Sequence, residues 1–180
     1  MGIIILTGPK HSGKTSAGRA LAALVSGVFT DLDASIQTQT GKSPRTLYRE
    51  GPGVFRKAEA EALGRLLGEG AGPGPRIVAA GGGLIDNPEA LALLEQAERA
   101  GAACGVYIEI SAGTAWERIA AAAGTEGLPP FLNTGDPQET HQALHERRAA
   151  AYRERARFTV AGDGKSPEEI AGEIAGLAGL

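Results

Sequence analysis

Short apolar runs alternate with stretches of helical periodicity along the whole chain. The clearest run is Ile3-Ile4-Ile5-Leu6, which stands between turn residues and is typical of a strand buried on both faces of a parallel sheet. The pattern predicts strands at residues 2–7, 28–31, 76–80, 104–110 and 157–161. It predicts helices at residues 14–26, 33–40, 44–50, 53–68, 88–99, 111–123, 137–155 and 167–178. This alternation indicates a three-layer α/β/α fold with a five-stranded parallel sheet.

Length and composition restrict the class of protein. A chain of 180 residues is expected to form one domain that buries its own core. The single cysteine, Cys104, excludes a disulfide within the chain and fits a reducing cytoplasm. Glycine contributes 27 of the 180 residues, about twice its usual share of ~7%. Since 42% of the residues are hydrophobic, this excess does not indicate disorder.

Charge and hydropathy argue against two classes of partner. The chain has 18 basic and 21 acidic side chains, with the signs interspersed, so no basic surface for nucleic acid is predicted. Its apolar runs are far shorter than the ~20 residues of a membrane span, and no basic segment precedes the first run as in a signal peptide. We therefore expect a cytoplasmic protein that acts on a small molecule.

Residues 8–15 match the phosphate-binding pattern G-x-x-x-x-G-K-[ST]. A glycine-rich turn could match by chance, but this segment follows a predicted buried strand and opens a predicted helix, which favours binding of a nucleoside triphosphate. Backbone N–H groups and the helix N-terminus would face the phosphates, Lys14 would reach the β- and γ-phosphates, and Thr15 would ligate Mg²⁺. The expected nucleotide-binding residues are Gly8, Pro9, Lys10, His11, Ser12, Gly13, Lys14, Thr15 and Ser16.

Three further motifs follow along the chain, and each has a structural alternative. Asp31 and Asp33 lie two residues apart at the end of the second predicted strand, where they could form a ligand-binding site or an acidic turn with a helix cap. Arg56 and Glu59 share one helix face, where a solvated ion pair is the common outcome. Gly81-Gly82-Gly83 follow the third predicted strand, where a ligand can approach the backbone closely or the chain simply turns.

The order and spacing of these motifs resemble the shikimate kinases, which are P-loop kinases similar to nucleoside-monophosphate kinases. The resemblance runs over nearly the whole chain and includes Thr40-Gly41 and Arg148-Ala149-Ala150-Ala151-Tyr152. It implies ATP and Mg²⁺ as cofactors and phosphorylation of a hydroxyl on a carboxylate-bearing polyol, shikimate. It also implies a monomer with one kinase domain over residues 1–180, an acceptor-binding segment at about 33–65 and a lid at about 124–136.

The resemblance also implies roles for single residues. Asp31 would help Thr15 to hold Mg²⁺, and Asp33 would accept hydrogen bonds from the acceptor hydroxyls and draw the proton from the attacking oxygen. Arg118 falls where the family places an arginine against the adenine ring. The residues implied to bind the acceptor are Asp33, Arg56, Gly81, Gly82, Gly83 and Arg148. An arginine fork suits a carboxylate and an ionised aspartate suits hydroxyls, although Arg118 and Arg148 could also be solvated helical side chains. We expect Lys14, Asp31 and Asp33 to carry the catalysis.

The predicted lid departs from the family pattern. Shikimate kinases carry an R-P-L-L-like stretch whose arginine reaches the transferring phosphoryl group, but here the stretch is Leu128-Pro129-Pro130-Phe131-Leu132 and residues 124–136 contain no Lys or Arg. Such an arginine can be worth roughly 10³–10⁵ in rate. Three interpretations stay open. Another cation, such as Lys10 or Arg118, replaces the arginine; the lid acts mainly by excluding water; or the protein phosphorylates another acid, such as gluconate, or binds nucleotide without catalysis.

Overall fold

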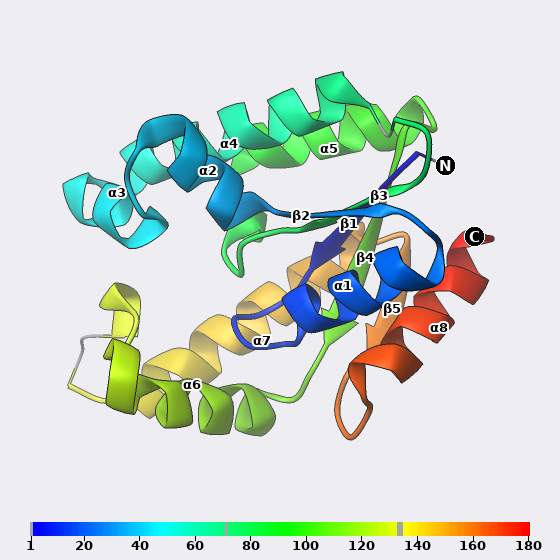
Figure 1. Cartoon of the computed structure of the whole chain (residues 1–180). Coiled ribbons are helices and arrows are strands. Elements are labelled where there is room, and N and C mark those ends of the chain that lie inside the picture. The colour runs from blue at the N-terminus through cyan, green and yellow to red at the C-terminus, as the bar shows by residue number, and fades with distance from the viewer. Residues whose placement is uncertain (1, 71, 133–134) are drawn as a thin grey trace.

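A parallel sheet forms the centre of the protein in the computed structural model, which describes residues 2–70, 72–132 and 135–180. Within these residues the sheet has five strands in the order β2-β3-β1-β4-β5 (Figure 1). The strands are β1 (Ile3–Thr7), β2 (Val28–Asp31), β3 (Arg76–Ala79), β4 (Ala103–Glu109) and β5 (Phe158–Ala161). The predicted strands and the predicted three-layer class are confirmed.

Helices cover both faces of this sheet. Those in the described residues are α1 (Lys14–Leu24), α2 (Leu32–Thr40), α3 (Pro44–Glu50), α4 (Pro52–Glu69), α5 (Pro88–Arg99), α6 (Ala112–Glu126), α7 (Pro137–Arg155) and α8 (Pro167–Ala178). Figure 1 shows α4 and α5 above the sheet and α1 and α8 below it. Because successive side chains of a strand point to opposite faces, Ile5 packs in the upper core with Leu63 and Leu94, and Leu6 packs in the lower core with Leu21 and Ile174.

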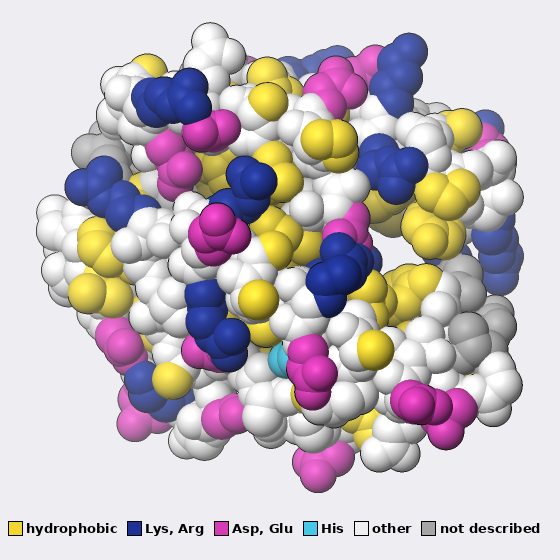
Figure 2. Space-filling view, turned by 180° about the vertical axis from the view of Figure 1, so that it is seen from behind, with side chains coloured by type: hydrophobic (Ala, Val, Ile, Leu, Met, Phe, Trp, Pro, Cys, Tyr) yellow, Lys and Arg dark blue, Asp and Glu magenta, His cyan; other side chains and the backbone are white. Residues whose placement is uncertain are grey.

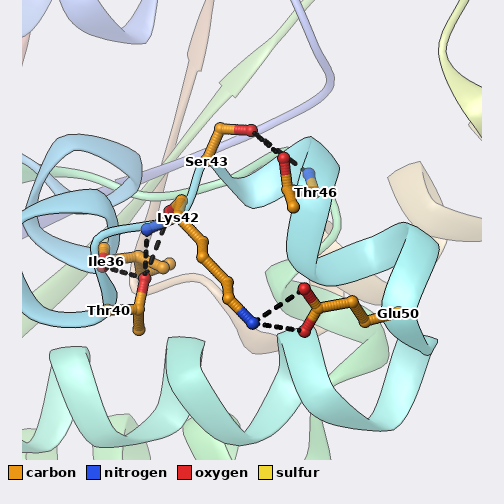
Figure 3. A network of polar contacts seen from close by, with 6 residues as sticks. All are labelled: Ile36, Thr40, Lys42, Ser43, Thr46 and Glu50. Carbon is orange, nitrogen blue, oxygen red and sulfur yellow. Dashed lines mark hydrogen bonds and ion pairs between the residues drawn. The ribbon is translucent and has the colours of Figure 1, made fainter.

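A polar network fixes the corner between α2 and α3 (Figure 3). The Ser43 hydroxyl accepts a hydrogen bond from the Thr46 backbone N–H at 3.2 Å, and a proline follows Ser43, so the predicted helix start is confirmed. The Thr40 hydroxyl accepts a hydrogen bond from the Lys42 N–H at 3.2 Å, and the Lys42 ammonium donates to both carboxylate oxygens of Glu50, at 2.8 and 2.9 Å. The network therefore holds α3 at a defined angle to α2.

The structure differs from the sequence-based expectation at the end of α6 and at two short 3₁₀ helices. Helix α6 runs to Glu126, three residues beyond the predicted end, and Gly127 then turns the chain with a φ of +69°. A short 3₁₀ helix at Leu84–Asp86, which was not predicted, follows the three glycines. A second 3₁₀ helix, Pro130–Leu132, lies within the predicted lid. Residues 133–134 of that lid, and residues 1 and 71 of the predicted domain, lie outside the described residues.

The surface carries charges of both signs. Figure 2 shows basic and acidic side chains interspersed over the face seen from behind, and a hollow on the right beside the grey atoms. In the part of the chain that the structure describes, no helix combines the length and apolar character needed to cross a membrane.

Candidate active site

The predicted site motifs meet at the carboxyl ends of neighbouring strands. The loop at residues 8–13 follows β1, Asp31 ends β2, and residues 81–83 follow β3, which lies between β1 and β2 in the sheet. This is the edge at which parallel α/β sheets bind ligands. Two cavities open here, which we call the phosphate-loop cavity and the lid cavity.

The two cavities are defined by their lining residues. Lining the phosphate-loop cavity are Lys10, His11, Gly13, Lys14, Thr15, Ser16, Asp31, Asp33, Ala79, Ala80, Gly81, Gly82 and Arg118. Lining the lid cavity are Lys10, Asp33, Ser43, Pro44, Arg45, Tyr48, Phe55, Gly81, Gly82, Gly83, Pro129, Phe131 and Arg148. The lid cavity lies between the start of α3 and the lid, which corresponds to the hollow in Figure 2.

The loop after β1 has the backbone that a phosphate-binding turn requires. Gly8 has a φ of +144°, and a Cβ there would lie 2.5 Å from the carbonyl oxygen of Ile108, so a larger residue would clash with backbone. Gly13 has a φ of +91° at the N-cap of α1. His11 also has a positive φ, of 61°, which marks a tight curl of the loop. The loop thus closes over the N-terminus of α1, where backbone N–H groups can face an anion.

The Lys14 ammonium is buried inside this loop. It donates hydrogen bonds to the carbonyl oxygens of Gly8, at 3.0 Å, and Pro9, at 2.7 Å. Burial lowers the pKa of Lys14 to about 8, and the nearby carboxylates of Asp33 and Asp31 oppose this shift. The protonated form therefore still predominates at neutral pH, and the loop holds a fixed positive charge.

Asp31 joins the end of β2 to both α1 and α2. One carboxylate oxygen accepts hydrogen bonds from the N–H groups of Asp33, at 3.0 Å, and Ala34, at 3.2 Å, and so caps α2. The other oxygen accepts a hydrogen bond from the Thr15 hydroxyl at 3.2 Å. The helix-cap interpretation is therefore correct, and Asp31 also contacts Thr15.

Asp33 lies where the two cavities meet, because its side chain lines both. Burial raises the pKa of Asp33, and the charge of Asp31 raises it further. The ammonium groups of Lys14 and Lys10 oppose these effects and favour the ionised form. A carboxylate with a raised pKa is a stronger base than an ordinary aspartate, so this position suits a group that accepts a proton.

Glu59 is a buried carboxyl group that the sequence analysis did not assign to the site. One oxygen accepts a hydrogen bond from the Asn87 amide at 3.0 Å, and the other has no hydrogen-bond partner among the described residues. A Cβ on Gly81 would lie 3.0 Å from that second oxygen and 3.4 Å from an oxygen of Asp33. Burial raises the pKa of Glu59 to about 7, although the hydrogen bond from Asn87 opposes the shift.

The structural alternative for Arg56 and Glu59, a solvated ion pair, is wrong. Glu59 is fully buried against the site, whereas the Arg56 side chain is exposed and the Arg56 carbonyl oxygen accepts a 2.7 Å hydrogen bond from Asn87. Because the two residues are three positions apart, their side chains start near one face of α4. The Glu59 side chain nevertheless packs into the interior and does not reach solvent. In the sequence, only the family motif that contains Arg56 and Glu59 indicated that Glu59 lies at the site.

Arg148 lies in the lid cavity in a defined orientation, so the solvated alternative is wrong for this residue. Its Nε and Nη2 atoms donate to one oxygen of Asp86, at 2.8 and 2.6 Å, and its guanidinium carbon lies 5.5 Å from the centre of the Phe131 ring. Burial raises the pKa of Asp86, but hydrogen bonds from Arg147 and Arg148 outweigh this and hold it below its ordinary value. A Cβ on Gly83 would lie 3.4 Å from Arg148 Nη2, so glycine leaves room beside the guanidinium.

The remaining predicted residues divide into those that line a cavity and those that do not. Arg118 is exposed at the phosphate-loop cavity and donates to the carbonyl oxygen of His11 at 2.9 Å. Thr15, Ser16, Gly81 and Gly82 line that cavity as well. Gly8 and Ser12 form the interior of the loop, and Pro9 lines a smaller third cavity beneath the lid. Arg56 lines neither main cavity.

Arg45 is a second cation of the lid cavity, and no motif pointed to it. Its Nη2 atom donates to the carbonyl oxygen of Leu128 at 3.2 Å, which links α3 to the residue directly before Pro129. Tyr48 and Phe55 add an aromatic wall, with their ring centres 6.3 Å apart. The cavity thus combines apolar rings with positive charge, which suits a ring-shaped acid.

Comparisons with known proteins agree with the family resemblance of the motifs. A family model described as shikimate kinase matches residues 10–177. A shikimate kinase from Salinispora arenicola is 33% identical over 176 residues, which cover 97% of this chain and 96% of that protein. The structure of a shikimate kinase from Acinetobacter baumannii in complex with shikimate has a TM-score of 0.83 and 27% identity, and covers 99% of this chain and 93% of that one. A gluconokinase from Sinorhizobium meliloti shares the fold, with a TM-score of 0.63 and 24% identity over 99% of this chain and 93% of that one.

Proposed function

Because the chain belongs to the shikimate kinase family, we propose that it transfers the γ-phosphoryl group of ATP to the 3-hydroxyl of shikimate. The observation that carries this proposal is the position of Asp33, which lines both the phosphate-loop cavity and the lid cavity. A phosphoryl transfer brings the donor phosphate and the acceptor hydroxyl together, and a base beside the attacking hydroxyl can take its proton. Two cavities that meet at Asp33 support this proposal.

The phosphate-loop cavity is the proposed ATP site. The loop N–H groups, the N-terminus of α1 and the buried ammonium of Lys14 would bind the phosphates, and Arg118 would lie against the adenine. The Thr15 hydroxyl and the Asp31 carboxylate supply oxygen ligands of the kind that Mg²⁺ prefers, 3.2 Å apart. When bound there, Mg²⁺ would neutralise part of the phosphate charge.

The lid cavity is the proposed acceptor site. Arg148 would bind the carboxylate of shikimate with its planar fork, and the exposed Arg56 would add a second positive charge from the start of α4. The rings of Tyr48, Phe55 and Phe131 would contact the cyclohexene ring. The backbone of residues 81–83 would approach the hydroxyl groups closely, because glycine leaves no side chain in the way.

The proposed step moves one phosphoryl group and one proton. The acceptor oxygen forms a bond to the γ-phosphorus, the bond from phosphorus to the bridging oxygen breaks, and ADP leaves. Asp33 accepts the proton of the attacking hydroxyl, and its raised pKa makes it a better base for this purpose. Lys14 stays protonated and balances the charge of the β- and γ-phosphates.

The proposal is tested by a coupled assay of ADP release with a panel of hydroxy acids, comprising shikimate, quinate and gluconate. We expect release to be stimulated by shikimate far more than by the others, since the lid cavity provides both an arginine fork and aromatic side chains. Stimulation by gluconate alone would make the protein a different hydroxy-acid kinase. ATP binding by calorimetry without turnover on any acid would make it a nucleotide-binding protein.

The finer parts of the proposal concern the state of the protein in the cell. We propose a cytoplasmic monomer that binds no nucleic acid. The single cysteine supports the cytoplasm, the interspersed charges argue against nucleic acid, and the family resemblance implies the monomer. Sedimentation at several concentrations checks the monomer, because self-association would raise the measured mass with concentration.

A further inference from the structure

The lid of this protein does not supply the cation that its family uses at the transferring phosphoryl group. Residues 124–136 contain no Lys or Arg, and Pro129 lines the lid cavity at the position of the family arginine. A cation that replaces this arginine has to reach the phosphoryl group as it passes from ATP to the acceptor. It therefore has to lie where the phosphate-loop cavity and the lid cavity meet.

Lys10 satisfies this condition. The lining residues that the two cavities share are Lys10, Asp33, Gly81 and Gly82, so Lys10 is the one cation common to both among the described residues. Asp33, the proposed base, is the one acidic residue common to both cavities among the described residues. Lys10 and the proposed base therefore lie on the same short path between donor and acceptor.

The backbone of Lys10 is held in place by the glycines after β3. A Cβ on Gly82 would lie 2.8 Å from the Lys10 nitrogen and 3.3 Å from its Cα, so these two loops are in close backbone contact. The Lys10 side chain itself is exposed. The exposed ammonium on this fixed backbone is therefore accessible to a bound phosphoryl group.

The other cations of the site are placed differently. Lys14 is buried among the loop carbonyls, and Arg118 is bonded to the carbonyl of His11; both line only the phosphate-loop cavity. Of the two main cavities, Arg45 and Arg148 line only the lid cavity, where Arg45 contacts the lid backbone and Arg148 contacts Asp86. Each of these side chains faces one end of the reaction path.

We propose that Lys10 is a catalytic residue whose ammonium contacts the oxygens of the phosphoryl group during transfer, in place of the missing lid arginine. This inference rests on the proposed kinase function. In the step, the acceptor oxygen bonds to phosphorus, the bond to the ADP oxygen breaks, and the proton goes to Asp33. Lys10 stays protonated throughout and balances the charge on the phosphoryl oxygens.

The test compares Lys10→Ala and Lys10→Arg with Lys57→Ala, a control at an exposed lysine of α4 that lines neither cavity. We expect kcat with shikimate to fall by roughly 100-fold or more in Lys10→Ala, while the Kd values for ATP and shikimate change by less than about threefold. Lys10→Arg should retain most of the activity. In the double variant Lys10→Ala/Pro129→Arg, the new lid arginine should restore part of the lost kcat. An unchanged kcat in Lys10→Ala, or a loss matched by weaker ATP binding, overturns the proposal.

A second measurement separates this inference from the kinase function. ADP with aluminium fluoride and Mg²⁺ imitates the transferring phosphoryl group without any acceptor. Calorimetry should show that aluminium fluoride tightens ADP binding in the wild type and in Lys57→Ala. In Lys10→Ala this increase in ADP affinity should be at least tenfold smaller. Equal gains in all variants, or no gain in the wild type, contradict the role of Lys10. If Lys10→Ala loses the gain but the wild type does not turn over shikimate, the result contradicts the proposed function and still supports the role of Lys10.

Discussion

Arg148 donates two hydrogen bonds to the same carboxylate oxygen of Asp86, at 2.8 Å from Nε and 2.6 Å from Nη2. This pairing holds the guanidinium in the lid cavity beside Phe131 before any acceptor is bound. The orientation of the proposed carboxylate-binding group is therefore set by the 3₁₀ helix that ends at Asp86.

Arg148→Ala is predicted to raise the KM for shikimate by about 10- to 100-fold, since a charged, two-pronged hydrogen bond is lost. The KM for ATP should change by less than about threefold. Steady-state kinetics with each substrate varied in turn checks this. Arg153→Ala is the control, because Arg153 lies on the same helix but pairs with Glu109 away from the lid cavity. Equal losses for ATP and shikimate would place the acceptor elsewhere.

Arg56→Ala tests whether the exposed arginine of α4 reaches the bound acid. We expect the KM for shikimate to rise by roughly 3- to 10-fold, less than for Arg148, because Arg56 lines neither cavity and has to be ordered on binding. Lys57→Ala removes a neighbouring exposed charge, which lies 3.9 Å from Glu61, and should leave both KM values unchanged. Identical kinetics for the two variants would remove Arg56 from the acceptor site.

Glu59→Gln is predicted to change how the stability of the protein depends on pH. The pKa of Glu59 is raised from 4.5 to about 7 by burial, so the unfolded state loses its proton first as the pH rises. Protonated Glu59 thus contributes its full stabilisation of the folded state below pH 4.5, and this contribution is lost as the pH rises to about 7. Between pH 5 and 8 the wild type should lose about 2–3 kcal/mol of unfolding free energy relative to the variant. Urea unfolding at both pH values measures this, and parallel pH profiles would contradict the raised pKa.

Arg45→Ala is predicted to loosen the lid, because the contact of Arg45 with the carbonyl oxygen of Leu128 links the lid to α3. Limited proteolysis without ligand should cut near residues 127–132 several-fold faster than in the wild type. Arg49→Ala, an exposed position on the same helix, is the control. No difference between the two variants would show that the Arg45 contact does not hold the lid.

The fold could be predicted closely because several independent features of the sequence indicate the same helices and strands. The apolar runs, the glycine-rich loop and caps such as Ser43 all indicate the same elements, and α3, α5, α7 and α8 begin and end at the predicted residues. The extension of α6 to Glu126 was missed because the boundary was placed before the glycine at 124 rather than the one at 127. Only Gly127 has the positive φ that ends the helix.

The site could be predicted only where a motif carried it. The phosphate loop was predicted because its chemistry needs those residue types at that spacing, whereas Asp33 and residues 81–83 were assigned to the site through the family resemblance. Arg45 and Asp86 were missed, because each acts through a contact between segments far apart in the chain. Glu59 belongs to a motif, but its burial depends on how α4 packs beside Asn87, and no local pattern indicates this.

Asp33 joins the two halves of the proposed reaction, so its removal provides the most direct test. Wild type and Asp33→Asn are each incubated with ATP, Mg²⁺ and shikimate, and the products are identified by phosphorus and proton NMR. The wild type should form shikimate 3-phosphate and ADP in equal amounts, and the variant should be slower by roughly 10²–10⁴-fold because it cannot accept the proton. Its circular dichroism spectrum should match that of the wild type. A wild type that forms no phosphorylated shikimate, or an Asp33→Asn variant as fast as the wild type, would contradict the account.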